Sequence, residues 1–531
     1  MTKFLSSVLL VLLVSFGLSF GGPTHSAVRS SDTLVIWAIN NGAGAQGSLK
    51  SLMRNYQKET GVSVNIVILE WIDAFEKIQK ALLDTTGMED SPDVVQLGST
   101  WVPYFASVGG LRSLNSLSFK IDFSRFMEAG LRSAHLEGDT NYYAMPWFMD
   151  VRGLFVNERL WKELNVNESN VDSIGKFMGT LRAIGKSDLK NVAGKKVAPF
   201  AFPSKGDWSG AQQMAPVIWN FGGDFIVRDS AGLRSGLLDS NFLKGFAVYA
   251  AIMGDVDMAP NSLQDNSSQN TDRFVRSEQL MVYGTSELIR LLEFFPSEGG
   301  LRTTPIAEDG IMTIPFPIGP GGKAAFVGGS HLALSKRGDA LRHAQAEKLL
   351  VYLLRADNMD AFSRKIGFLP ADQGLVRIWM KDMRYTQLVN NLERGKTFLN
   401  IPEWGAIEAL MNNLAGDVGR VNFKTLDAKK RAMGIAKLLV AADKAVNDIL
   451  KAPVDSTKNQ PSLEEIAKRL SDLPAEIEPT NLNLKPSPVS HTRDHEVFVV
   501  RCLIGVALLF MLWKLRSRIK KIRRIMKRKN K

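Results

Sequence analysis

The sequence predicts an α/β fold in which helices cover an open, doubly wound sheet of parallel strands. Strand and helix patterns alternate from Thr33 onward, which is typical of such a sheet. Apolar residues make up 45% and charged residues 23% of the 531 residues, so the chain can bury large cores. Cys502 is the only cysteine, so no internal disulfide forms and stability must come from burial.

The first elements follow one another closely. Residues 34–37 (LVIW) form a short apolar run that predicts a buried strand. Apolar residues then recur at i, i+3, i+4 and i+7 of a helix: Leu49, Leu52, Met53 and Tyr56. We expect this helix to end at Gly61, with strands at 62–68 and 92–97 and a second helix between them.

The N-terminal segment has the pattern of a secretory signal. A basic residue, Lys3, precedes an uncharged apolar run over 4–20, and small residues follow. We therefore expect residues 1–27 to be a signal peptide, although the cleavage site is poorly defined. An uncleaved N-terminal anchor would export the same domain.

A second apolar run lies near the C-terminal end. Residues 497–513 are interrupted only by Arg501 and would span roughly 25 Å as a helix. We expect a transmembrane helix over 497–515, from Val497 to Leu515. Eleven Lys and Arg residues and no acidic residue lie between Lys514 and Lys531, so 516–531 is expected to be a cytoplasmic tail. Residues 28–490 would then lie outside the cytoplasmic membrane.

The charge of the remaining chain is close to zero. The formal net charge is +12, and removing the eleven basic residues of the tail leaves about +1. A large nucleic-acid-binding face is therefore not expected. Between the body and the span, 451–496 is predicted to form a helix, begun by a Ser462–Glu465 capping box, and a Pro-rich stalk.

The order of several short segments resembles one protein family. They are 34–37 (LVIW), 56–62 (YQKETGV), 91–95 (SPDVV), 108–114 (VGGLRSL), 142–146 (YYAMP), 154–160 (LFVNERL), 219–224 (WNFGGD), 328–335 (GGSHLALS) and 367–370 (GFLP). Together they are similar to the extracellular solute-binding proteins of ABC importers, of the maltose-binding-protein type. The chain departs from that pattern at Ser113, Val156 and 284–286 (GTS), which leaves the ligand open.

The resemblance implies a two-lobed periplasmic-binding-protein fold of type II, in which each lobe is a sheet flanked by helices. The first lobe would comprise 33–148 and 322–366, and the second 152–320 and 370–450. Three chain crossings would join the lobes, near 145–153, 320–328 and 367–370. The resemblance also implies a monomer that holds a small solute between the lobes and delivers it to ABC permease subunits, without a cofactor or metal.

Candidate ligand residues follow the predicted strands, because ligands of open α/β sheets bind at the carboxyl ends of strands. The candidates are Trp37, Asn40, Glu70, Trp71, Ser99, Trp101, Trp147 and Asp150, together with Trp219 and Trp404 from later segments. Indole rings can stack on the apolar face of a sugar while amide and carboxylate groups bond its hydroxyls. The alternative is that these tryptophans pack in the core and that Asn40 only shapes a turn.

The sequence leaves two other functions open. The six histidines have no metal-binding spacing, and neither a P-loop nor a nucleophile elbow occurs, so an enzyme would depend on a carboxylate pair such as Glu70 and Asp150. A ligand sensor is the stronger alternative. The 18 residues after Trp513 are too few for a signalling domain, so a sensor would need a separate membrane partner.

Overall fold

The computed structural model describes residues 33–42, 44–83, 91–117, 120–204, 206–393, 395–424, 427–452 and 460–477. The predicted signal peptide, the span over 497–515 and the basic tail lie outside these residues. Within the described ranges, none of the helices is both long enough and apolar enough to cross a bilayer.

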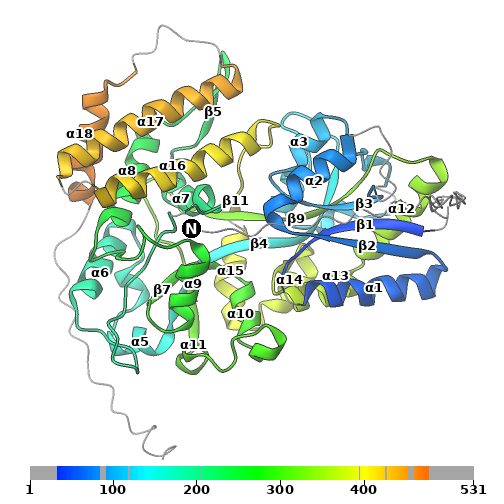
Figure 1. Cartoon of the computed structure of the whole chain (residues 1–531), viewed down its shortest axis with the longest axis horizontal. Helices are drawn as coiled ribbons and strands as arrows, with labels where there is room; N and C mark the ends of the chain where they lie inside the picture. Colours follow the sequence, from blue (N-terminus) through cyan, green and yellow to red (C-terminus); the bar gives the residue numbers. More distant parts are fainter. Residues whose placement is uncertain are drawn as a thin grey trace, which may run out of the picture.

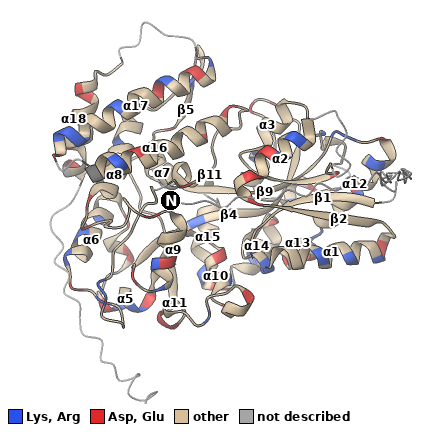
Figure 2. Ribbon diagram, in the orientation of Figure 1, with Lys and Arg blue, Asp and Glu red and all other residues tan. Residues whose placement is uncertain are grey.

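The protein has two lobes built around one extended set of strands (Figure 1). The main path of the sheet has the order β10-β4-β9-β3-β1-β2, and β7, β8 and β11 pair with its members. β1 is parallel to β2 and β3, as the strand and helix alternation predicted, whereas β9 is antiparallel to β3 and β4. Figure 2 shows that charged residues lie mainly on helices and loops, and that the strands are mostly uncharged.

Elements of the first lobe alternate as expected. They are β1 (Thr33–Ile39), α1 (Ala45–Thr60), β2 (Ser63–Leu69), α2 (Trp71–Leu83), β3 (Val94–Gly98), α3 (Val102–Ser107), α4 (Glu128–Arg132), β9 (Ala325–Leu334), α12 (Ala340–Leu353) and α13 (Ala356–Ile366). In Figure 1, α1 and α13 lie on one side of the strands and α2 and α3 on the other. Gly61 ends α1 in a left-handed conformation (φ 77°), as the sequence predicted.

The second lobe contains most of the remaining helices. Its elements are α5 (Glu158–Glu163), α6 (Ile174–Lys186), α7 (Gly210–Trp219), β5 (Ile226–Asp229), β6 (Gly232–Ser235), α8 (Ser240–Gly254), α9 (Ser267–Val275), β7 (Met281–Thr285), α10 (Glu287–Leu291), α11 (Pro305–Asp309) and β8 (Ile311–Ile314). After a return to the strands come β10 (Leu369–Pro370), α14 (Gln373–Trp379), α15 (Met383–Glu393), β11 (Gly395–Lys396), α16 (Trp404–Lys424), α17 (Ala428–Leu450) and α18 (Leu463–Ile477).

One long strand, β4 (Ala144–Asn157), passes from the first lobe into the second. Its residues 144–151 pair with β9, and its residues 152–157 pair with β7 and β8. The change of partner falls between Val151 and Arg152, at the point where the two lobes meet. Side chains on this part of β4 are therefore placed to contact both lobes.

The core divides into separate apolar clusters. One surrounds α1, α12 and α13, and another fills the second lobe around α6, α7, α8 and α16 to α18. Apolar side chains of α14 and α15 join the first of these clusters, although the second lobe was expected to include 370–450. The lobe boundaries themselves remain predictions.

The helix predicted before the stalk is present as α18. The Ser462 backbone N–H donates to the Glu465 carboxylate (2.7 Å), and the Glu465 N–H donates to the Ser462 hydroxyl (3.3 Å), which confirms the capping box. Ile466, Ala467 and Leu470 are buried, and the helix packs on α8 and α17. Residues 463–477 thus share an apolar cluster with α8 and α17.

Candidate ligand site between the lobes

An aromatic pair lies at the ends of two first-lobe strands. Trp71 follows β2 and is 43% exposed, and its ring packs edge-on against Trp101, which follows β3, with centroids 5.3 Å apart. The Phe75 ring also packs edge-on against Trp101, with ring centroids 5.5 Å apart. Beside them, the Asn40 amide donates to both carboxylate oxygens of Glu70, at 3.1 and 3.3 Å. Four predicted residues therefore meet at one edge of the sheet.

Two charged side chains lie where β4 changes partners. Asp150 Oδ2 is 3.5 Å from Arg152 Nη2, and the Asp150 side chain is 19% exposed. Burial raises the pKa of Asp150, and the positive charge of Arg152 opposes this effect. A carboxylate in this position gains from a ligand that donates hydrogen bonds, because its Oδ1 has no hydrogen-bond partner among the described residues.

Arg152 leads into a polar chain through the second lobe. Its Nη2 donates to the Gln212 Oε1 atom on α7 at 2.5 Å, and Gln212 Nε2 donates to the Glu408 carboxylate on α16 at 3.1 Å. The guanidinium lies 5.7 Å from the ring centroids of both Trp208 and Phe326. Trp208 is 65% exposed, so the second lobe also presents an indole ring to solvent next to these polar groups.

The Glu408 carboxyl interacts with both lobes. Burial raises its pKa, and hydrogen bonding to Gln212 and to Thr100 opposes that shift. Thr100 directly follows β3 in the first lobe, next to Trp101. The polar chain from β4 through α7 and α16 therefore reaches the strand end that carries the predicted aromatic pair.

A second acidic group approaches Asp150 from α10. Burial raises the pKa of Glu287 to about 7, with Arg290 opposing the shift and the negative charge of Asp150 adding to it. A Cβ at Gly42, in the loop after β1, would lie 3.0 Å from Glu287 Oε1, so that loop passes close to α10. Carboxylates from β4, α10 and α16 thus surround one region.

Five predicted residues lie in the core instead of on an exposed surface. They are no more than 5% exposed: Trp37, Ser99, Trp147, Trp219 and Trp404. Trp147 is the extra residue of a β-bulge in β4, which directs its ring onto Phe362 in a stacked pair (4.0 Å). Trp404 stacks on Phe398 (4.1 Å). Their ligand contacts remain predictions, and in this structure their side chains pack in the core.

The other buried candidates also have structural partners. The Trp219 indole donates to Asp224 (3.2 Å), and Lys396 lies 5.1 Å from its ring centroid. The Ser99 backbone N–H donates to the Gly329 carbonyl (2.9 Å), which joins β3 to β9. These contacts hold the crossings in place around the site.

Sequence reasoning missed the polar and aromatic groups of the second lobe. Arg152, Trp208, Gln212, Glu287 and Glu408 come from a strand interior, a loop and three helices. Most candidates came from the strand-end rule, which does not apply to helix positions. Among the residues that the structure describes, no three His, Cys, Asp or Glu side chains are placed to bind a metal.

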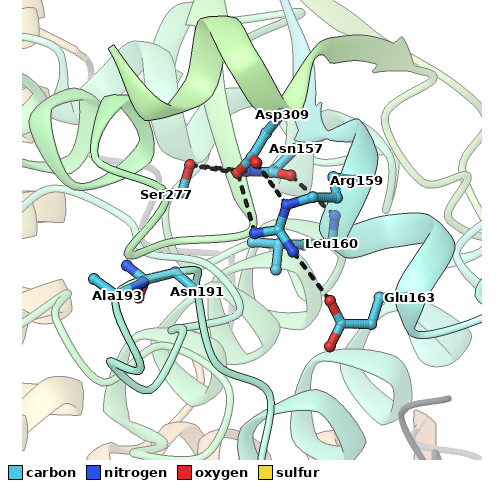
Figure 3. Close-up of polar contacts among 8 residues, drawn as sticks. All are labelled: Asn157, Arg159, Leu160, Glu163, Asn191, Ala193, Ser277 and Asp309. Carbon is cyan, nitrogen blue, oxygen red and sulfur yellow. Dashed lines mark hydrogen bonds and ion pairs between the residues drawn. The ribbon is translucent and has the colours of Figure 1, made fainter. Parts of the chain in front are cut away.

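A separate polar network fixes the far end of β4 (Figure 3). Asn157 caps α5 by accepting from the Leu160 N–H (3.0 Å) and donates to Asp309 (2.7 Å). Burial would raise the pKa of Asp309, but hydrogen bonds from Arg159, Asn157 and Ser277 together lower it. These side chains are already paired with each other, which indicates a structural role for the network.

Two lobes that share the long strand β4, with carboxylates gathered near the point where this strand changes partners, are the features of a solute-binding protein. The chain belongs to the family of bacterial extracellular solute-binding proteins, whose model matches residues 51–383. It is 24% identical over 385 residues to the diacetylchitobiose binding protein DasA of Streptomyces coelicolor, covering 71% of this chain and 82% of that protein.

Solved structures share the fold. The GacH receptor of Streptomyces glaucescens, studied unliganded and with acarbose, has a TM-score of 0.63 at 17% identity, covering 79% of this chain and 98% of that chain. A solute-binding protein of Thermotoga lettingae bound to alpha-D-tagatose has a TM-score of 0.64 at 16% identity, covering 79% of this chain and 100% of that chain. By their names, these relatives are a binding protein, a receptor and a solute-binding protein.

Proposed function

We propose that this protein is a membrane-tethered, extracytoplasmic solute-binding protein that captures a carbohydrate between its lobes and delivers it to an ABC importer. The observation that carries the proposal is the pair of exposed indoles, Trp71 on the first lobe and Trp208 on the second, beside polar groups of both lobes. Exposed apolar rings that are bordered by polar groups are typical of a ligand-binding surface.

The chemistry around these rings suits a sugar. Sugar C–H faces can pack on indoles, and sugar hydroxyls can donate to carboxylates such as Asp150 and Glu70 or accept from Asn40 and Arg152. The mixture of acidic and basic groups favours a neutral, polyhydroxylated ligand over a free anion. The names of the similar proteins, which include diacetylchitobiose, acarbose and tagatose, support this ligand class.

Binding would act on the hinge without covalent chemistry. Asp150 and Arg152 lie where β4 passes between the lobes, and the Glu408 carboxyl interacts with both lobes. A ligand that contacts both lobes has higher affinity for the closed form, so it shifts the equilibrium toward closure. The permease of the importer would then recognise the closed form.

The tether is proposed from the sequence alone. A signal at 1–27, a span over 497–515 and a basic tail at 516–531 would place the binding lobes outside the cytoplasmic membrane, with the C-terminus inside. Protease added to intact cells should then remove the lobes and leave the tail. Protection of the lobes would contradict this location.

A thermal-shift panel on the detergent-solubilised full chain tests the ligand class. We expect a saccharide to raise stability by about 2.7 kcal/mol when present at 100 times its Kd. The panel should contain mono- and oligosaccharides, acetylated amino sugars, polyols, peptides and phosphate esters. If peptides or phosphate esters raise the melting temperature while every saccharide has no effect, the carbohydrate assignment is wrong although the fold remains.

A further inference from the structure

A line of lysines runs along the solvent face of α17 in the second lobe. Lys430, Lys437 and Lys444 recur every seven residues on the helix, and Lys451 follows at the same spacing as its C-terminal cap. All four are exposed. We call these four residues the α17 lysine stripe. Seven residues are close to two helical turns, so the stripe lies on one face.

The stripe carries excess positive charge. Lys444 pairs with Asp448 at 2.6 Å, which is the ion pair that the described residues show for this stripe. With Lys429, the exposed face of α17 has five lysines against Asp427 and Asp448, which leaves +3. The exported body as a whole has a charge of only about +1, so this face is more basic than the rest. Figure 2 shows α17 at the outer edge of the second lobe.

The position of α17 connects the stripe to the proposed tether. The opposite face of α17 packs on α16 and α18, with Ile435, Leu439 and Val446 buried, so this helix is firmly part of the second lobe. α18 ends at Ile477, and nineteen residues of sequence separate it from Val497. Even a fully extended segment of that length reaches only roughly 65 Å, which keeps the second lobe near the bilayer.

We propose that the α17 lysine stripe docks on anionic phospholipid headgroups, so that the second lobe rests on the membrane and the first lobe is the moving lobe. The proposal depends on the tether in the proposed function. Each lysine near an anionic surface strengthens binding by about fivefold, and salt weakens it within a Debye length. Weak docking suffices because a tether holds the lobe at high effective concentration.

The test uses the full chain in nanodiscs, with Cys502→Ser and one introduced cysteine for a fluorophore. One label is at Ala441→Cys, on the face of the stripe, and the other at Leu341→Cys, exposed in the first lobe. A nitroxide on the lipid headgroup quenches a fluorophore that lies at the membrane. Discs of POPC are compared with discs containing 30% POPG.

We expect the label at position 441 to be quenched at least threefold more in POPG discs than in POPC discs, and 0.5 M NaCl should abolish this difference. The variant K430E/K437E/K451E should abolish it as well. The matched control K50E/K58E/K381E should leave this difference in quenching unchanged. It reverses the charge of two exposed lysines on α1 and of one between α14 and α15. The label at position 341 should show little quenching in either disc.

Four results would overturn the proposal. If the label at position 441 is quenched equally in the two discs, anionic lipid is not the partner. If the stripe variant impairs import without changing the quenching, the stripe binds a protein partner instead of lipid. Equal quenching at positions 341 and 441 would rule out the orientation. If the full chain does not insert into the discs, the proposed tether is wrong, and lipid docking fails with it. Saccharide binding in the thermal-shift panel would be unaffected.

Discussion

The two sides of the candidate site differ in how they are built. On the first lobe, Asn40, Glu70, Trp71 and Trp101 follow β1, β2 and β3 and meet at one sheet edge. On the second lobe, the corresponding groups come from a loop and from the first two turns of helices, as with Trp208, Gln212 and Glu408. The topology of a parallel sheet brings strand ends together, whereas helix positions become neighbours only through packing.

The tryptophans show a parallel difference between exposed and buried rings. Trp71 and Trp208 expose large parts of their indoles, whereas Trp147 and Trp404 are stacked on phenylalanines in the core. We therefore expect the exposed rings to bind ligand and the buried rings to stabilise the fold. Substitutions should separate the two roles.

The largest effect is expected from Trp147→Ala. Removing a fully buried indole that stacks on Phe362 should lower the free energy of unfolding by about 3–5 kcal/mol, because a cavity remains in the core. Urea unfolding of the full chain in detergent measures this loss. Trp71→Ala is the control and should cost less than about 1 kcal/mol. If Trp147→Ala keeps the stability of the natural chain but binds ligand more weakly, Trp147 contacts the ligand.

The second prediction concerns pH and Glu287→Gln. The folded pKa of Glu287 is about 7, above its ordinary value of 4.5, so the folded state holds a proton that the unfolded state loses first. The natural chain should therefore lose stability as pH rises from 4.5 to 7, and the glutamine variant should lack this loss. Between pH 5 and pH 8, the free energy of unfolding of the variant should rise by about 2 kcal/mol relative to that of the natural chain.

Urea unfolding at pH 5, 6, 7 and 8 checks this gain, because contributions of other groups cancel in the difference between the two proteins. Glu163→Gln is a suitable control, since Glu163 pairs with Arg159 at the surface of α5, away from Asp150. Parallel stability profiles for the natural chain and Glu287→Gln would show that burial does not raise the pKa of Glu287 in the folded state.

The sequence predicted the fold more fully than the site. Strands at 34–37 and 62–68, the end of α1 at Gly61 and the Ser462–Glu465 cap all depend on local patterns, and the structure confirms them. Trp147 shows why the site was harder to predict. A β-bulge turned its ring into the core, and no local pattern in the sequence marks that extra residue.

The third prediction compares Trp208→Ala with Trp71→Ala. Each should weaken binding of the saccharide identified by thermal shift by about 1–2 kcal/mol, roughly fivefold to thirtyfold in Kd, because one sugar face loses its aromatic contact. Calorimetry on the full chain in detergent gives the Kd values. If Trp208→Ala binds as tightly as the natural chain while Trp71→Ala does not, the second lobe contributes only polar groups to the ligand.

The smallest effect is expected from Asn40→Ala. The Asn40 amide donates to Glu70 at an exposed position, so the free energy of unfolding should change by less than about 0.5 kcal/mol. If Asn40 holds the Glu70 carboxylate toward the ligand, Kd should rise about threefold, and Glu70→Gln should produce a rise of similar size that is not additive with it. Additive effects would mean that the two side chains contact the ligand independently, and no effect on Kd would mean that Asn40 only shapes the turn after β1.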